Sequence, residues 1–128
     1  MKKYLVIGNP IGHSLSPKLH NYWIKENNID AVYNKKELNE TEIEGMVEDV
    51  KKGKIEGMNV TVPFKKSIIP FLDQLTILAK EVQSVNTIFK KNNKIIGDNT
   101  DIGGFEQSLK YINYSVKNKK IFILGAGG

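Results

Sequence analysis

The sequence of 128 residues contains no cysteine and no arginine, and it has no long apolar run. Without cysteine the chain has no disulfides, thiolate nucleophiles or Cys-ligated metals. A membrane helix needs about 20 consecutive apolar residues, and Met1-Lys2-Lys3 runs into a strand-like segment without a signal-peptide pattern. These absences predict a cytoplasmic chain with no membrane partner and no metal site.

The missing arginine also bears on ligand recognition. The formal net charge is +5, and the basic residues are 19 lysines scattered along the chain with acids between them. Nucleic-acid sites cluster their basic residues and use arginine for bidentate contacts to bases, so we expect no nucleic-acid partner. A carboxylate or phosphate ligand must instead be held by lysine, hydroxyl, amide or backbone N–H groups.

Strand-like and helix-like segments alternate along the chain. Apolar runs and alternation predict strands at 3–8, 31–38, 57–63, 85–90, 94–97 and 119–124. Helical spacing and breakers predict helices at 16–26, 41–53, in two pieces of 66–82 interrupted by Pro70, and after 101. Within 41–53, Thr41 and Glu44 have the spacing of a capping box, and the apolar stripe consists of Ile43, Met46, Val47 and Val50. Asn92-Asn93 is typical of a hairpin turn. The order predicts an α/β fold, a mixed sheet flanked by helices in three layers (α/β/α).

The loop from Gly8 to Pro17 ends at a predicted helix start. Ser16 is a good N-cap residue, and Pro17 suits the first helical position. Ser14 and Ser16 would then lie beside free N–H groups at the positive end of a helix dipole, which suits an anion. Capping alone would also explain Ser16, and ordinary loop composition would explain Ser14.

The segment 57–63 carries a second group of polar residues. Its alternation places three apolar residues on one face, namely Met58, Val60 and Val62, whereas Asn59 and Thr61 lie on the other. Lys65 follows at the carboxyl end of the strand, where open α/β sheets bind ligands. Its neighbour Lys66 has the same charge, and we expect Lys66 on a helix surface.

Three short polar or glycine-rich segments follow. Asn86-Thr87 could be an ordinary strand-edge pair. In the turn 97–101, Asp101 could cap the next helix, and Asp98 is a rival carboxylate. Ile121 to Leu124 leads into Gly125-Ala126-Gly127-Gly128, which indicates a strand entering an unfinished dinucleotide-binding loop.

Taken in order, these motifs resemble the substrate domain of shikimate dehydrogenase, and the resemblance covers essentially the whole chain. It implies reversible, NADP-dependent hydride transfer that interconverts 3-dehydroshikimate and shikimate in chorismate and aromatic amino-acid biosynthesis. It implies that Ser14 and Ser16 bind the substrate carboxylate, which Thr61 helps to place. The residues implied to bind the ring hydroxyls are Asn59, Thr61, Asn86 and Asp101. Lys65 is the implied proton-transfer group, paired with Asp101.

The resemblance also implies a domain organisation. Residues 1–101 would form the shikimate-binding catalytic domain, and 102–128 a connecting helix and the truncated start of the NADP-binding Rossmann domain. The cofactor residues would be Gly125, Ala126, Gly127 and Gly128, an incomplete NADP site. We therefore expect the isolated chain to bind substrate without turnover, and a homodimer is compatible with it. Two alternatives stay open: a quinate/shikimate dehydrogenase using NAD or NADP, and a non-catalytic shikimate-binding module.

Overall fold

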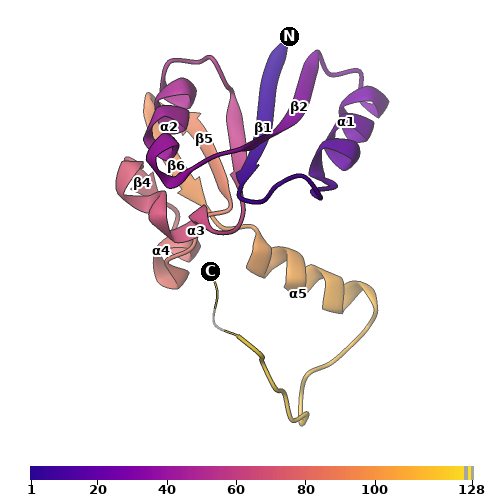
Figure 1. Ribbon diagram of the computed structural model, residues 1–128. Helices are drawn as coiled ribbons and strands as arrows, with labels where there is room; N and C mark the ends of the chain where they lie inside the picture. Colours follow the sequence, from indigo (N-terminus) through magenta and orange to yellow (C-terminus); the bar gives the residue numbers. More distant parts are fainter. Residues whose placement is uncertain (126, 128) are drawn as a thin grey trace.

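In the computed structural model, which describes residues 1–125 and 127, a six-stranded sheet carries helices on both faces (Figure 1). The strands are β1 (Lys2–Gly8), β2 (Ala31–Glu37), β3 (Gly57–Val60), β4 (Gln74–Leu75), β5 (Thr87–Lys91) and β6 (Lys94–Asp98). The helices are α1 (Ser16–Glu26), α2 (Ile43–Lys51), α3 (Phe64–Ser67), α4 (Ile77–Val82) and α5 (Asp101–Tyr111), with 3-10 turns η1 (Glu40–Glu42) and η2 (Ile69–Phe71). Within the described part, no helix has the length and apolar character that crossing a bilayer requires.

The sheet is mixed and has the strand order β2-β1-β3-β5-β6-β4. β1 runs parallel to β2 and β3, β5 is antiparallel to β3 and β6, and β4 is parallel to β6. The predicted α/β fold with a mixed, helix-flanked sheet is thus confirmed. The carboxyl ends of β3 and β6 therefore meet the start of β5, where Asn59 pairs with Thr87 and Thr87 with Asp98.

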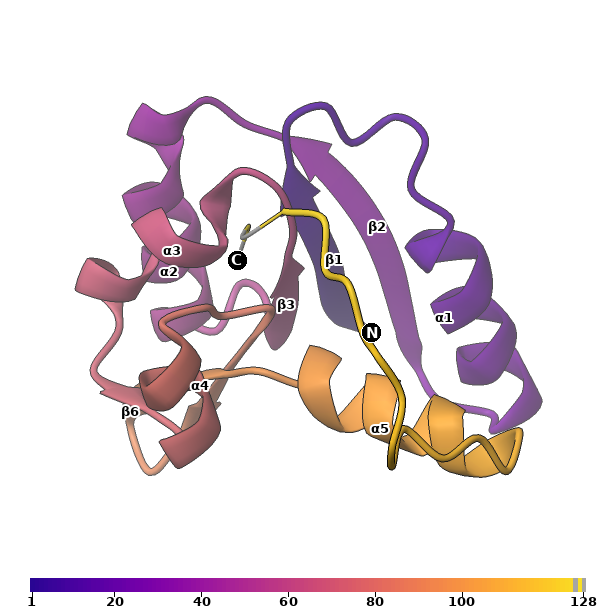
Figure 2. The same ribbon diagram turned by 90° about the horizontal axis from the view of Figure 1, so that it is seen from below.

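The two faces of the sheet carry apolar clusters of different size. Consecutive strand residues point to opposite faces, so Val6 and Ile7 of β1 belong to different clusters. Fifteen buried residues form the cluster that contains Ile7 and the apolar stripe of α2. The opposite cluster has three buried residues, Val6, Ile11 and Tyr33, and packs against Ile24 of α1. Figure 2 shows α1 and α2 at well-separated parts of the sheet.

Helix α2 confirms its predicted stripe, since its buried residues are Ile43, Met46, Val47 and Val50. Its predicted capping box at Thr41 and Glu44 was wrong by two residues. The box forms at Asn39, whose backbone N–H donates to Oε2 of Glu42 at 2.8 Å. The chain leaves β2 in an extended conformation at Asn39 and makes the turn η1 first, so the first free N–H groups belong to that turn.

The structure differs in detail from the expectations around Pro63 and Pro70. β3 ends at Val60, and Val62, expected on the buried face, is 63% exposed because strand alternation has stopped by then. The two helical pieces predicted in 66–82 are present as α3 and α4, but the interruption is wider than Pro70 alone, because η2 and the short strand β4 lie between them. Hydrogen bonds to β6 draw this stretch into the sheet, as Asp73 N–H donates to Ile95 O and Thr76 N–H to Gly97 O.

The hairpin turn is confirmed, with φ of 51° at Asn92 and 61° at Asn93. The predicted strand over 119–124 is wrong: these residues adopt no regular structure, and Ile121 to Leu124 are exposed. A strand needs a neighbour for its N–H and C=O groups, and no described strand pairs with this segment. The segment after α5 instead runs outside the sheet (Figure 1).

Candidate active site

A cleft of about 300 Å³ opens where β3 and β6 end and β5 begins. Most of the residues around it carry hydroxyl, amide or charged groups. Its lining consists of Val6, Ser16, His20, Asn59, Val60, Thr61, Lys65, Asn86, Thr100 and Asp101. The structure therefore brings together six of the predicted site residues, which come from four separate segments of the sequence.

Lys65 and Asp101 form an ion pair in this cleft. Nζ of Lys65 donates to Oδ2 of Asp101 at 2.7 Å, and the side chains are 18% and 51% exposed, respectively. The neighbouring Lys66 is exposed, as expected. Lys65 is the lysine of the cleft lining and Asp101 is its carboxylate, so this ion pair joins the basic and the acidic side chain of the site.

Asn99 explains why the carboxylate of Asp101 is available to Lys65. Asn99 is buried, its Nδ2 donates to Ser84 O at 3.0 Å, and its Oδ1 accepts from Asp101 N–H at 3.0 Å. Asn99 thus satisfies the N–H group of Asp101 at the start of α5, and the two oxygens of the Asp101 carboxylate accept from Lys65 and Asn86. The rival Asp98 is occupied elsewhere, because its Oδ1 accepts from Thr76 Oγ1 at 2.6 Å.

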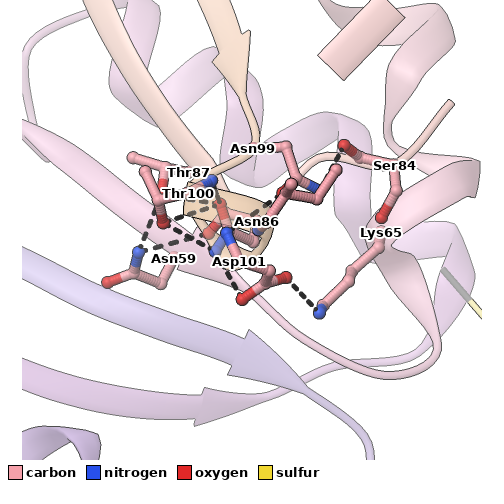
Figure 3. Close-up of polar contacts among 9 residues, drawn as sticks. Asn59, Lys65, Ser84, Asn86, Thr87, Asn99, Thr100 and Asp101 are labelled. Carbon is pink, nitrogen blue, oxygen red and sulfur yellow. Dashed lines mark hydrogen bonds and ion pairs between the residues drawn. The ribbon is translucent and has the colours of Figure 1, made fainter. Parts of the chain in front are cut away.

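Asn86 links the two sides of the site, as Figure 3 shows. Its Nδ2 donates to Oδ1 of Asp101 at 2.9 Å and to Oγ1 of Thr100 at 2.8 Å. Its Oδ1 accepts from Thr100 N–H at 2.9 Å and from Thr87 Oγ1 at 3.0 Å. Asn86 and Lys65 therefore hold the two oxygens of the Asp101 carboxylate from separate directions.

Asn59 on β3 extends this network to the other end of the cleft. Its Nδ2 donates to Asn86 O at 3.2 Å and to Thr87 Oγ1 at 3.1 Å, and its Oδ1 accepts from the Tyr33 hydroxyl at 2.6 Å. Burial raises the pKa of Tyr33, so the hydroxyl keeps its proton and remains a donor. Polar groups thus follow one another from Tyr33 through Asn59 and Asn86 to Asp101.

The serine loop reaches the cleft at the N-terminus of α1. The helix begins at Ser16, with Leu15 in the N-cap position, so the predicted N-cap at Ser16 was wrong by one residue. Ser14 lies outside the cleft lining, and its Oγ accepts from Ser16 N–H at 3.3 Å. The loop is tied to β2, since Ile11 N–H donates to Glu37 and Asn9 Nδ2 to Leu38 O.

Tyr33, His20 and Thr100 contribute to the site without having been predicted as site residues, although Thr100 lies within the polar turn 97–101. Tyr33 lies on β2 and His20 on α1, so neither belongs to a polar loop. The rings of His20 and Tyr33 stack with centroids 4.1 Å apart. Alternation in β2 could have placed Tyr33 on the same face as Val6, but strand order was needed to bring Tyr33 towards Asn59.

The glycine-rich end, predicted to be an incomplete NADP site, lies only partly within the described residues, so its cofactor role stays a prediction. Gly125 has a φ of 108°, which suits a glycine turn, yet no strand precedes it. Gly127 lines a hollow of about 240 Å³ with Val62, Pro63, Lys65 and Lys66. Ala126 and Gly128, also predicted to bind cofactor, lie outside the described residues. In a dinucleotide-binding fold, a strand and the helix after it bind the pyrophosphate. The described residues of the glycine-rich end form neither element.

The sheet order and the cleft define a class: α/β domains with a mixed sheet and a polar ligand cleft at the carboxyl ends of its strands. The chain belongs to the family described as the shikimate dehydrogenase substrate binding domain, whose family model matches residues 6–88. Within that family it is similar to shikimate dehydrogenase (NADP(+)) of Pelagibacter ubique, with 63% identity over 127 residues, 99% of this chain and 48% of the relative.

Solved structures of shikimate dehydrogenases are similar to this chain as well. Shikimate dehydrogenase 1 from Peptoclostridium difficile superposes with a TM-score of 0.93 at 35% identity, covering 99% of this chain and 47% of that chain. Shikimate 5-dehydrogenase from Thermus thermophilus in complex with shikimate superposes with a TM-score of 0.91 at 29% identity, covering 99% and 48%. The chain spans about half the length of the curated relatives that it matches.

Proposed function

We propose that this chain is the substrate-binding part of an NADP-dependent shikimate dehydrogenase, which reversibly reduces 3-dehydroshikimate to shikimate. The observation that carries the proposal is the Lys65–Asp101 pair, 2.7 Å long, within an amide- and hydroxyl-lined cleft that contains no arginine. The similar Pelagibacter protein is named for this activity, and the similar Thermus structure holds shikimate. The domain boundary near residue 101 belongs to the same proposal.

The cleft suits a small ring that carries a carboxylate and several hydroxyls. Ser16 at the start of α1 offers a hydroxyl and nearby free N–H groups, a combination that favours an anion. We assign the carboxylate to Ser14 and Ser16, with Ser14 acting beside Ser16 at the loop end and Thr61 contributing a hydroxyl. The ring hydroxyls are assigned to the remaining polar groups, Asn59, Thr61, Asn86 and Asp101.

Lys65 is assigned the proton transfer. In the direction of reduction, the Nζ ammonium donates a proton to the oxygen of the carbonyl as that oxygen becomes a hydroxyl; in oxidation, the neutral amine takes the proton back. Asp101 holds Nζ in place and stabilises its positive charge. NADP supplies the hydride chemistry when it is bound, and the described residues contribute binding, orientation and the proton.

The test is a titration of shikimate into this chain, followed by amide NMR shifts. We expect saturable shifts near the cleft that weaken sharply in a Ser14→Ala/Ser16→Ala variant and in Lys65→Ala, while the exposed Lys66→Ala serves as the matched control. A folded wild-type chain that gives no saturable shift contradicts the proposal. Joining the chain to the rest of a complete enzyme then tests NADP-dependent oxidation of shikimate.

Two other functions use the same cleft. A quinate/shikimate dehydrogenase would differ in its tolerance of quinate and in its use of NAD or NADP, which the complete enzyme would reveal. A non-catalytic binding module would hold shikimate in the same cleft without hydride transfer. Saturable shikimate binding without turnover in the complete protein would identify it. Cytoplasmic location and homodimer formation stay predictions.

A further inference from the structure

Tyr33 contacts the cleft residue Asn59 from a distant strand. It lies on β2, and β1 separates β2 from β3, which carries Asn59. Neighbouring strands lie about 4.8 Å apart, so the two residues are separated by roughly 10 Å. The two side chains together span this gap, with the Tyr33 hydroxyl 2.6 Å from Oδ1 of Asn59.

Tyr33 is fixed independently of any ligand. Its backbone N–H donates to Oδ1 of Asn21 at 2.9 Å, and its carbonyl accepts from Nδ2 of the same side chain at 2.7 Å. Its ring stacks on His20, whose Nδ1 lies 3.1 Å from Ser16 O. The side chain is 3% exposed. Tyr33 therefore presents its hydroxyl to Asn59 from a rigid position.

The amide of Asn59 can have only one orientation in this network. Nδ2 contacts Asn86 O, and a backbone carbonyl can only accept, so this end of the amide must be the NH₂ group. The second N–H donates to Oγ1 of Thr87. Both donors of Asn59 are thus engaged within the protein, and Oδ1 has one lone pair engaged by Tyr33.

We propose that Tyr33 is a positioning residue: with both N–H groups of Asn59 engaged by Asn86 and Thr87, Asn59 is a pure hydrogen-bond acceptor towards the cleft, and the Tyr33 hydroxyl holds the accepting Oδ1 in place. The substrate group that contacts Asn59 must then be a hydroxyl that donates, because the remaining hydrogen-bonding site of Asn59 is the second lone pair of Oδ1. A ketone, ether or fluorine at the same place would bring two acceptors together. This inference rests on the proposed function, in which Asn59 binds a ring hydroxyl.

The experiment measures the binding of shikimate and its three monodeoxy analogues to the 128-residue chain and to Tyr33→Phe. One hydrogen bond of this kind changes an equilibrium constant roughly three- to tenfold. We expect Tyr33→Phe to reduce the preference for shikimate over one monodeoxy analogue by that factor and to leave the other two preferences unchanged. Tyr22→Phe, which removes an exposed hydroxyl from α1, is the matched control.

A ligand series on the wild-type chain tests the same point if Tyr33→Phe fails to fold. The deoxyfluoro analogue at the position read by Asn59 can accept but cannot donate, so it should bind as weakly as the deoxy analogue. Binding equal to that of shikimate would overturn the inference. So would a folded Tyr33→Phe chain that keeps all three preferences, or one that loses affinity for all four ligands by the same factor.

The same experiment distinguishes failure of the proposed function from failure of the role assigned to Tyr33. A folded wild-type chain that binds none of these ligands contradicts the proposed function and the role of Tyr33 together, whereas wild-type binding with unchanged preferences in Tyr33→Phe contradicts the role of Tyr33 alone. A ligand-free signature completes the test: the side-chain NH₂ resonances of Asn59 should shift in Tyr33→Phe and not in Tyr22→Phe.

Discussion

The two faces of the sheet are built for different tasks. The face that packs against α2 belongs to a cluster of fifteen buried residues, and α2 itself contributes four of them. The face that packs against α1 has a cluster of three buried residues, and α1 has no buried residue. The cleft draws Val6, Ser16 and His20 from this second side.

Stability and ligand recognition are thus divided between the two faces of the sheet. Each strand residue serves one face only, so β1 can give Ile7 to the large cluster and Val6 to the cleft lining. Burial of apolar area dominates stability, whereas a cleft must leave polar groups accessible. We therefore expect substitutions on the α2 side to change the free energy of unfolding, and those in the cleft to change binding and turnover.

The largest expected effect is in the cleft. Lys65→Met in a complete enzyme should lower kcat by about 10²- to 10⁴-fold, because positioned proton transfer contributes about that factor. Its free energy of unfolding should change little, since Lys65 and Asp101 form a pair with one exposed partner and such pairs contribute roughly 0–1 kcal/mol. Steady-state kinetics and urea unfolding give the two quantities, with the exposed Lys66→Met as control. A large loss of stability with kcat unchanged would reverse the comparison of the faces.

The second-largest effect is expected on the stability of the face that packs against α2. Ile43→Ala removes a fully buried side chain from the α2 cluster and should lower the free energy of unfolding by about 2–5 kcal/mol, through lost burial and a cavity. Leu19→Ala on α1 is the matched control, since Leu19 is 47% exposed and the loss should stay below about 1 kcal/mol. Urea unfolding measures both. Equal losses would show that the α1 side stabilises the domain as much as the α2 side.

Local pattern predicted much of the α2 side, whereas the family resemblance pointed to most of the cleft residues. The stripe Ile43 to Val50 and the turn Asn92-Asn93 depend on residues a few positions apart, so sequence contains the needed information. Six cleft residues could be predicted because they lie in the short polar motifs that carry the family resemblance. Their assembly into one cleft follows from the parallel pairing of β1 with β3 and the hairpin of β5 and β6.

The remaining features depend on long-range contacts. Tyr33 contacts Asn59 across the intervening strand β1. This contact depends on the strand order, which is not encoded in the residues around Tyr33. The choice of Asp101 over Asp98 depends on Asn99 and Thr76, which occupy the competing hydrogen bonds. Segment 119–124 has the composition of a strand, but composition does not supply the partner that a strand requires.

On the α1 side, Tyr33 should make the free energy of unfolding depend on pH. Its pKa is raised by burial, so above about pH 10 the unfolded chain loses this proton while the folded chain retains it. Stability should therefore fall as pH rises, by about 1.4 kcal/mol per pH unit relative to Tyr33→Phe, and the two proteins should have parallel stability curves below pH 10. Urea unfolding at pH 9, 10 and 11 measures the difference. Lysine ionisation is common to both proteins, and Tyr22→Phe should follow the wild type; curves that stay parallel to pH 11 would contradict the prediction.

The smallest effect tests whether the two sides are coupled. Thr76 caps α4, accepting from Ala79 N–H at 3.3 Å, and donates to Asp98 at 2.6 Å, in the turn that leads to Asp101. Thr76→Ala should lower the free energy of unfolding by about 1 kcal/mol through the lost cap, and Thr76→Ser, which keeps the hydroxyl, should restore most of it. Shikimate affinity should change less than about twofold, because Asn99 still holds the start of α5 through its own bonds to Ser84 and Asp101. A tenfold loss of affinity in Thr76→Ala, rescued by Thr76→Ser, would instead mean that the packing on the α4 side sets the position of the Asp101 carboxylate.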